Sequence, residues 1–363
     1  MSKYYSTAKI DKKNATYNVI FGERSNGKTF ALLSKSLKQY FSDKSQMAYV
    51  RRWKEDIIGR RADKLYGGIN ESGIVKKMSD GEFSGVHYYA GKFYLCNYDE
   101  RGKAIYSDGD VIGYTFALSD GEHDKSTSFP KIKTVMFDEF LSSKVYLQDE
   151  FVLFMNTVST IVRKRTDVKI YMLGNTVNKF CPYFQEMGLN NVQSMKQGNI
   201  DVYHYGESPL TVAVEYCKSN NTNKDSEENK YFAFDNPKLE MITGGTWEMS
   251  LYPHLPYKYK PNQVLLEFFI DFNDSIYHGE VITVDETTFI YIHDKTTPIR
   301  KPHEQIIYSL DYHAEINYNR SIFKPMSRTQ EKILYFFKHD KVFYQNNSIG
   351  DAVSNYLKIA KRV

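Results

Sequence analysis

An eight-residue run near the N-terminus has the pattern of a phosphate-binding loop. Residues 22–29 read Gly-Glu-Arg-Ser-Asn-Gly-Lys-Thr and match G-x-x-x-x-G-K-S/T. In such a loop the backbone N–H groups turn inward around an anion, and the lysine and threonine open a helix whose positive end faces the phosphates. The chain is therefore predicted to bind a nucleoside triphosphate. The expected contacts are Gly22, Arg24, Ser25, Asn26, Gly27, Lys28 and Thr29.

Two adjacent acids supply the groups that hydrolysis would need. Asp138 and Glu139 directly follow the apolar residues 135–137. At the carboxyl edge of a sheet, beside the phosphate loop, Asp138 can hold the Mg²⁺ that Thr29 also contacts. Glu139 is then placed to polarise the attacking water. A solvated strand end is the alternative for any Asp-Glu pair, but the strand, loop and Lys-Thr unit upstream favour catalysis.

Three further polar residues each allow two interpretations. Asn175 follows an apolar segment and either contacts the γ-phosphate or forms a turn with Gly174. Arg163 ends an apolar-faced helix, either as a partner of the helix dipole or as an arginine finger for a neighbouring subunit. Arg24 either bridges phosphates or pairs with Glu23.

The elements around these residues alternate between strand and helix, as a parallel sheet requires. Strands are predicted at 17–21, 47–50, 133–138 and 168–173, and one helix over 151–162. The helix after the loop should bury Phe30, Leu33, Leu37 and Tyr40 or Phe41 on one face. Residues 66–118 break the alternation, and short strands at 86–89, 92–96 and 111–118 predict a β-rich insertion packed beside the sheet.

A polar stretch divides the chain into two predicted domains. Residues 218–229 contain no apolar side chain, and we predict an ATPase domain over 1–217, a linker over 218–260 and a smaller domain over 261–363. The smaller domain opens with strands at 264–272, 276–284 and 288–292 and closes with helices near 328–339 and 349–362.

Composition indicates a soluble protein of the cytosol. Of the 363 residues, 41% are apolar and 25% charged, and no apolar run approaches the roughly 20 residues of a membrane span. The N-terminus lacks the apolar segment of a secretion signal. Cys96, Cys181 and Cys217 are predicted to be reduced thiols.

The charged residues are unevenly distributed along the chain. Residues 1–65 carry 15 Lys and Arg against 6 Asp and Glu, and residues 201–300 carry 8 Lys and Arg against 16 Asp and Glu. This asymmetry fits a polyanion partner, contact between copies of the chain, or scattered solvated charge.

The order of these motifs resembles the DNA-packaging ATPases of phi29-like tailed phages, a terminase-type family of the ASCE P-loop class. The residues that carry the resemblance are Arg24 in the loop, 49–54 (Tyr-Val-Arg-Arg-Trp-Lys), 135–140 (Val-Met-Phe-Asp-Glu-Phe), 156–158, 163–165 and 174–176. The resemblance runs through the whole ATPase region and continues more weakly, but collinearly, in the C-terminal strands and helices.

The resemblance implies a ring motor, pentameric in this family. It implies docking on the capsid portal (connector), in the host cytoplasm, and ATP- and Mg²⁺-dependent translocation of double-stranded DNA. Lys28, Thr29, Asp138 and Glu139 fall on nucleotide, metal and catalytic positions, and Arg163 falls on the trans arginine finger. Lys54 and Lys125 fall near lysines that line the DNA channel. The C-terminal domain is implied to be RNase H-like, a vestigial nuclease that engages the portal or a packaging RNA.

Three other functions remain open from the sequence. A complete terminase would carry an active metal-dependent nuclease in the C-terminal domain, with Asp271, Asp294 and Asp351 as candidate ligands. A helicase-like or plasmid-transfer ATPase would act on single strands. A nucleotide switch without hydrolysis would serve mainly as a docking protein, although Glu139 beside Asp138 argues against it.

Overall fold

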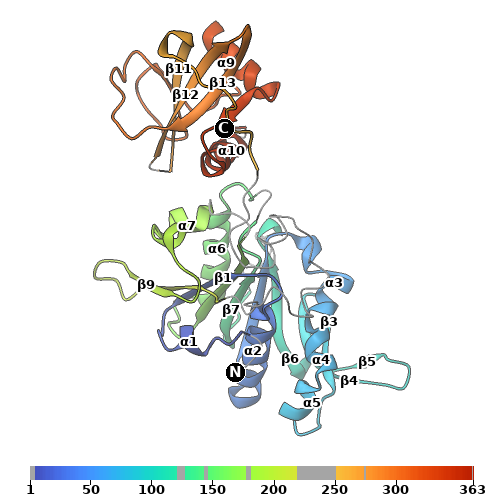
Figure 1. The fold of residues 1–363 in the computed structure, drawn as a ribbon. Coiled ribbons are helices and arrows are strands. Elements are labelled where there is room, and N and C mark those ends of the chain that lie inside the picture. The colour runs from blue at the N-terminus through green and yellow to red at the C-terminus, as the bar shows by residue number, and fades with distance from the viewer. Residues whose placement is uncertain are drawn as a thin grey trace. The chain divides into compact units, whose positions relative to one another are not determined.

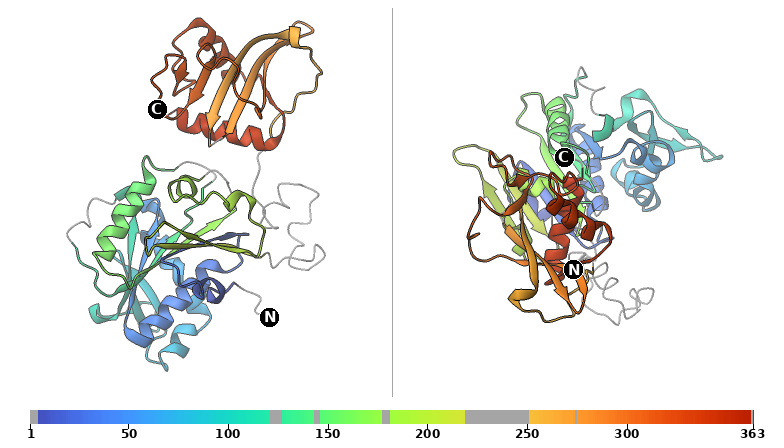
Figure 2. Two further views of the ribbon diagram at one scale, coloured as in Figure 1. Left: turned by 90° about the vertical axis from the view of Figure 1, so that its left-hand side faces the viewer. Right: turned by 90° about the horizontal axis from the view of Figure 1, so that it is seen from above.

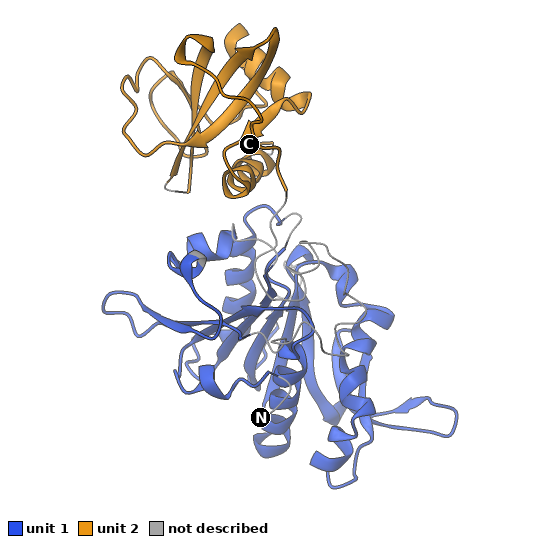
Figure 3. Ribbon diagram, viewed as in Figure 1, with its two compact units in different colours: residues 1–248 blue, residues 249–363 orange. Residues whose placement is uncertain are grey.

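A computed structural model describes residues 5–120, 127–142, 146–176, 181–218, 251–273, 275–361 and 363. The chain forms two compact units, Met1–Glu248 and Met249–Val363 (Figure 3). The predicted linker over 218–260 falls largely on residues outside the described ranges, which resume at 251. No helix in the described part of the chain is long and apolar enough to cross a membrane.

The first unit is built on one mixed sheet, which contains ten strands among the described residues (Figure 1). The strand order is β3-β4-β6-β2-β7-β8-β1-β10-β9, and β5 pairs with β4. The six strands from β6 to β10 in this order run parallel, and β3, β4, β5 and β9 are antiparallel to their neighbours. The strands are β1 (Tyr17–Gly22), β2 (Gln46–Arg51), β3 (Gly85–Tyr89), β4 (Lys92–Tyr98), β5 (Ala104–Ile105), β6 (Val111–Ala117), β7 (Ile132–Asp138), β8 (Lys169–Asn175), β9 (Ile200–His204) and β10 (Thr211–Tyr216).

Helices cover both faces of this sheet, so its central strands are buried on both sides (Figures 1 and 2). Alternate residues of β1 enter two different cores. Val19 and Phe21 pack in the core that includes α6, and Ile20 packs in the core that includes α2. The helices of this unit are α1 (Ala8–Asp11), α2 (Lys28–Asp43), α3 (Gly59–Asp63), α4 (Gly67–Glu71), α5 (Ile74–Met78), α6 (Glu150–Val162) and α7 (Pro182–Glu186).

The buried face of α2 differs from the predicted one at its first residue. Leu33, Leu37 and Tyr40 are buried as predicted, together with Leu32, whereas Phe30 is 38% exposed. Phe30 instead lines a pocket at the start of the helix. The helical period predicts an apolar face, but it does not show which residue of that face lines a pocket instead of the core.

The insertion over 66–118 is part of the main sheet rather than a layer beside it. Its strands β3, β4 and β6 form where the sequence predicted them, and β6 pairs in parallel with β2. The segment before them is helical, with α4 and α5 packed in the core that includes α2. The α/β class with a mostly parallel sheet is thus confirmed, and the insertion extends that sheet.

The second unit contains a six-stranded mixed sheet among its described residues, with the order β15-β14-β11-β12-β13-β16. The strands β11, β12 and β13 form an antiparallel meander, and β14 runs parallel to β11. Side chains of Ser327 and Asn346 cap the two helices by accepting backbone N–H bonds. The elements are β11 (Val264–Phe272), β12 (Ser275–Val284), β13 (Thr287–Asp294), β14 (Ile306–Ser309), β15 (Tyr318–Asn319), α9 (Arg328–Lys338), β16 (Val342–Tyr344) and α10 (Asn347–Ala360).

Candidate nucleotide-binding site

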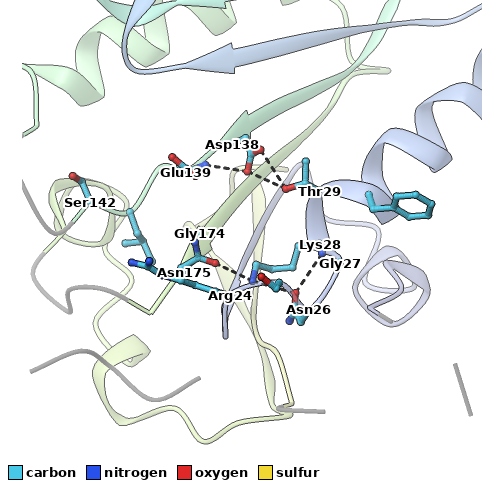
Figure 4. A pocket seen from close by; sticks show the side chains of 13 residues that line it. Arg24, Asn26, Gly27, Lys28, Thr29, Asp138, Glu139, Ser142, Gly174 and Asn175 are labelled. Atoms are coloured by element: carbon cyan, nitrogen blue, oxygen red, sulfur yellow. Dashed lines mark hydrogen bonds between the residues drawn. The ribbon is translucent and has the colours of Figure 1, made fainter. Parts of the chain in front are cut away.

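A pocket of about 690 Å³ lies where the central strands of the first sheet end (Figure 4). The strands β1, β8 and β7 are consecutive neighbours, and Gly22 stands beside Asn175 in the register. Parallel strands place their carboxyl ends at one edge, which is where α/β proteins bind ligands. The pocket is lined by Arg24, Ser25, Asn26, Gly27, Lys28, Thr29, Phe30, Asp138, Glu139, Leu141, Ser142, Gly174 and Asn175.

The loop between β1 and α2 has the backbone shape that a phosphate cradle requires. Ser25 and Gly27 have φ values of 60° and 89°, so the chain turns sharply before the helix begins at Lys28. Gly22 is needed for another reason, because a β carbon there would lie 2.8 Å from the β carbon of Cys217. The helix begins directly behind the loop, so its positive end faces the pocket.

Lys28 is held in the loop by oxygen atoms of its surroundings. Its Nζ donates to the carbonyl of Glu23 at 2.6 Å, to Oδ1 of Asn26 at 3.2 Å and to Oδ1 of Asn175 at 3.4 Å (Figure 4). Burial lowers the pKa of Lys28, and the nearby carboxylates of Asp138 and Glu23 oppose that shift. A buried cation beside a glycine-rich loop is suited to bind an anionic phosphate.

Thr29 and Asp138 form one wall of the pocket and fit a Mg²⁺ ion. The Thr29 hydroxyl donates to Oδ2 of Asp138 at 3.2 Å. Octahedral Mg²⁺ with bonds of about 2.1 Å places adjacent ligand atoms about 3 Å apart, so this pair could share the ion. The Tyr49 hydroxyl also donates to Oδ2 at 3.2 Å, and the Glu139 backbone N–H donates to Oδ1 at 3.1 Å. Burial raises the pKa of Asp138, while Arg51 opposes the shift.

Glu139 lines the pocket, but its carboxylate is paired with Arg51. The Arg51 Nη2 lies 2.6 Å from Oε2 of Glu139 and 3.3 Å from Oδ2 of Asp56. The Glu139 side chain is 58% exposed, whereas that of Asp138 is 11% exposed. To accept a proton from water, the Glu139 carboxylate would have to give up at least part of its contact with Arg51 and bind the water instead. Arg51 lies in the 49–54 segment that carries the resemblance, but its pairing with Glu139 was not predicted from the sequence.

Residues 77–225 match the family model described as Podovirus DNA encapsidation protein (Gp16). The DNA packaging proteins of Bacillus phages PZA and phi29 are each 26% identical to this chain over 186 residues, which cover 50% of this chain and 49% of each relative. This chain is similar to phage DNA-packaging proteins. The matched part spans about half the length of these curated relatives.

Two solved structures share the fold of this chain over nearly its whole length. A structure described as the Phi-28 gp11 DNA packaging motor is 17% identical with a TM-score of 0.53, and each chain is 99% covered. The packaging motor assembly of bacteriophage Phi-29 is 18% identical with a TM-score of 0.58 and the same coverage. The family match includes Asp138, Glu139 and Asn175 but begins after the phosphate loop. The assignment of the loop therefore depends on its sequence pattern and its geometry.

Arg163 is not among the described residues that line the pocket. It follows α6 with φ 42°. The neighbouring Arg165 binds backbone carbonyls, including those of Ile161 at 2.9 Å and Ile132 at 2.7 Å. Arg165 therefore satisfies the end of the helix, and Arg163 remains a candidate to act on another subunit.

Arg52 holds the chain just after the two acids. Its Nη2 donates to the carbonyl of Phe140 at 2.7 Å, and its Nε pairs with Oε2 of Glu150 at 2.7 Å. The Tyr183 hydroxyl donates to the other oxygen of Glu150 at 2.8 Å. Arg52 and Glu150 are both buried. This pair fixes the segment that follows β7, and no local sequence signal predicted it.

The remaining predicted site residues that the structure describes do not line the pocket. Lys54 forms an ion pair with Asp120 at 2.6 Å, and Lys125 falls outside the described residues. Asp271, Asp294 and Asp351 lie on β11, β13 and α10 of the second unit. Within the described ranges, these three carboxylates do not form a group close enough to share a metal ion.

Proposed function

We propose that the chain is the ATP-hydrolysing subunit of a phage DNA-packaging motor. The observation that carries the proposal is the meeting of Lys28, Thr29, Asp138 and Glu139 in one pocket of a chain that is similar to phage DNA-packaging proteins. In the proposed site the loop and Lys28 bind the phosphates of ATP, and Thr29 and Asp138 hold Mg²⁺. The ion would neutralise charge that develops on the transferred phosphoryl group.

Each remaining residue of the site has a proposed task. Glu139 accepts the proton of the attacking water after exchanging its contact with Arg51. Asn175, already 3.4 Å from Lys28 Nζ, contacts the γ-phosphate and responds to its loss. Arg24 binds phosphate oxygens, and Arg163 reaches the pocket of a neighbouring subunit.

The proposed assembly is a ring, a pentamer as the family resemblance implies, that docks on the capsid portal in the host cytoplasm. Double-stranded DNA would pass through the ring, with Lys54 and Lys125 contacting phosphates, and a packaging RNA would join where the phage encodes one. The second unit would serve as an RNase H-like docking domain. Its antiparallel meander, with β14 parallel to the first strand, supports this fold.

The deciding experiment compares ATP turnover by the wild type and Glu139→Gln, with and without double-stranded DNA and portal-bearing capsids. We expect DNA or capsids to stimulate the wild type. The substitution should lower turnover by about 10²–10⁴-fold, the usual contribution of a general base, and leave ATP binding intact. The exposed Glu207 offers a control, and Glu207→Gln should retain wild-type turnover. ATP binding without turnover under every condition would instead identify a nucleotide-dependent docking protein.

A further inference from the structure

Two histidines and a glutamate gather on one face of the second sheet, and none of them is among the acids considered for a nuclease. His278 and Glu280 are two residues apart on β12, so their side chains share a face. His293 on β13 stands directly opposite His278 in the register. One ligand atom from each of the three side chains lies within 4.8 Å of the others. The pleat of two adjacent strands therefore assembles a two-histidine, one-carboxylate group.

The orientation of His293 suits a metal ligand. Its Nδ1 lies 2.9 Å from the backbone oxygen of Asp294, so this nitrogen is the expected donor, N–H to carbonyl. Its Nε2, with the remaining lone pair, lies 3.5 Å from Oε2 of Glu280. Two acceptors that face each other at this distance are stabilised by a cation between them. Metal-binding histidines commonly use one nitrogen for the ion and the other for a backbone or carboxylate oxygen.

His278 contributes a buried nitrogen that its neighbours do not satisfy. Its Nε2 has no hydrogen-bond partner within the described part of the chain, and it lies 3.6 Å from Oε1 of Glu267. Buried polar atoms are nearly always paired, so an unpaired imidazole nitrogen beside a carboxylate calls for a ligand. The ring stacks on Phe269 with centroids 4.7 Å apart, which fixes its plane.

Glu280 is also held in place from outside the group. Only 8% of the residue is exposed, and the Tyr259 hydroxyl donates to its Oε2. The His278 and His293 rings lie 4.8 Å apart between centroids. Each of the three side chains is therefore oriented by a contact outside the group: His278 by Phe269, Glu280 by Tyr259, and His293 by the carbonyl of Asp294. Metal ligands in proteins are commonly oriented by such contacts.

We propose that His278, Glu280 and His293 bind one divalent transition-metal ion, with Zn²⁺ the best match. Two imidazoles and a carboxylate are borderline donors that favour zinc over Mg²⁺ or Ca²⁺. Tetrahedral zinc with bonds of about 2.0–2.1 Å places ligand atoms about 3.3 Å apart. The Glu280–His293 separation of 3.5 Å nearly meets this value, and His278 reaches it by a small side-chain movement. Water or Glu267 supplies the fourth ligand, and the ion cross-links β12 to β13.

A protonated His293 paired with Glu280 is the competing explanation, and metal titration separates the two. The full-length protein is stripped with a chelator and titrated calorimetrically with ZnCl₂ in excess Mg²⁺, which occupies the nucleotide site. We expect one zinc per chain, with affinity reduced at least 10-fold in His278→Gln and in His293→Gln. The exposed His303 provides the matched control, and His303→Gln should bind zinc as the wild type does.

Two further measurements keep the result interpretable. Circular dichroism of the metal-free variants establishes that they fold. The visible spectrum of the Co²⁺-loaded wild type identifies the ligands: nitrogen and oxygen donors give ligand-field bands without the thiolate charge-transfer band that cysteine ligation would add. Absence of stoichiometric zinc in the wild type, undiminished binding by the folded histidine variants, or a thiolate band would each overturn the proposal.

Discussion

Asp138 and Glu139 are adjacent in sequence but lie in opposite surroundings. Asp138 is buried and accepts hydrogen bonds from Thr29, Tyr49 and the backbone of Glu139. Glu139 is largely exposed and bound to Arg51. One residue can therefore keep a fixed position for a metal ion while the other changes partner. This division suits a site in which the ion stays bound while the water must be activated at a particular moment.

The buried charge of Asp138 predicts a pH-dependent effect of Asp138→Asn on stability. Burial raises the folded-state pKa of this carboxyl above 3.8. Its stability contribution is thus fully present below the unfolded pKa and is lost as pH rises through the folded pKa. At pH 7 without nucleotide, Asp138→Asn should raise the Tm by a few degrees, because asparagine avoids the buried charge. Thermal unfolding from pH 4 to 8 measures this.

The gain in Tm should shrink as the pH falls toward 4, because protonation of the wild-type carboxyl removes the buried charge. Asparagine preserves the local hydrogen bonds, because the hydroxyls of Thr29 and Tyr49 can each accept as well as donate. The same variant should lose Mg²⁺-dependent ATP turnover. An equal Tm difference at pH 4 and pH 7 would show that the effect is not electrostatic.

The sequence predicted the residues of the site better than their contacts. Lys28, Thr29 and Asp138 were identifiable because a local pattern, or a strand end, fixes their positions. The pairing of Arg51 with Glu139 joins residues 88 positions apart and depends on which strands are neighbours. The helical period predicts Phe30 in the core, because periodicity shows which residues share a face but not which of them stay exposed. Its exposure and its place in the pocket lining came only from the structure.

At the scale of elements, a single buried ion pair connects three parts of the site. Arg52 follows β2, Glu150 begins α6, and Arg52 also binds the carbonyl of Phe140 after β7. The segment that carries Glu139 is therefore attached to both a strand and a helix. This attachment would limit the movement of Glu139 to its side chain.

Removing one partner of this pair should destabilise the first unit strongly. Glu150→Ala leaves the Arg52 guanidinium buried without its carboxylate, at a cost of about 3–5 kcal/mol in the free energy of unfolding. Urea unfolding measures the loss, and the exposed Glu207→Ala should change the value by less than about 0.5 kcal/mol. The double variant Arg52→Ala/Glu150→Ala should lose less than the sum of the single variants. Additive losses would contradict direct coupling of the two side chains.

The elements themselves were largely predictable, and their order was not. Buried strands such as 17–21 and 168–173 have apolar runs that a parallel sheet explains. Strand order depends on contacts between distant segments, so β8 between β1 and β7 could not be inferred from periodicity. For the same reason the insertion was expected beside the sheet, whereas β4 and β6 continue it.

For the whole molecule, the proposed trans role of Arg163 predicts complementation between two inactive variants. Glu139→Gln lacks the base of its own pocket, and Arg163→Ala lacks the finger offered to a neighbour. A mixed ring contains some interfaces with both groups intact, so mixing the proteins should restore part of the ATP turnover. Steady-state ATPase assays of each variant and of their mixtures test this.

The adjacent Lys164→Gln is the control for charge at the end of α6 and should retain turnover on its own. Full activity of an isolated monomer, or no recovery in mixtures that form rings, would contradict a finger acting between subunits. Arg165 is unsuitable as a control, because it binds the carbonyls of Ile161 and Ile132.

The group of His278, Glu280 and His293 in the second unit was not predicted from the sequence, which was searched for acids at the ends of strands. Attention to acids after apolar strands selected Asp271 and Asp294, which do not converge with Asp351 within the described residues. The spacing His-x-Glu on one strand and a histidine on the next was the available signal. Only the register of β12 against β13 turns that spacing into a cluster.

The close approach of Gly22 to Cys217 joins the end of β10 to the start of the phosphate loop. The β10 strand lies beside β1, and the Cys217 N–H donates to the carbonyl of Phe21 at 2.8 Å. The two segments can approach this closely because residue 22 has no β carbon, which would lie 2.8 Å from that of Cys217. A substitution at Cys217, which is not among the described residues that line the pocket, would therefore act on the backbone that begins the phosphate loop. The shape of the nucleotide pocket thus depends in part on a buried residue that no nucleotide would touch.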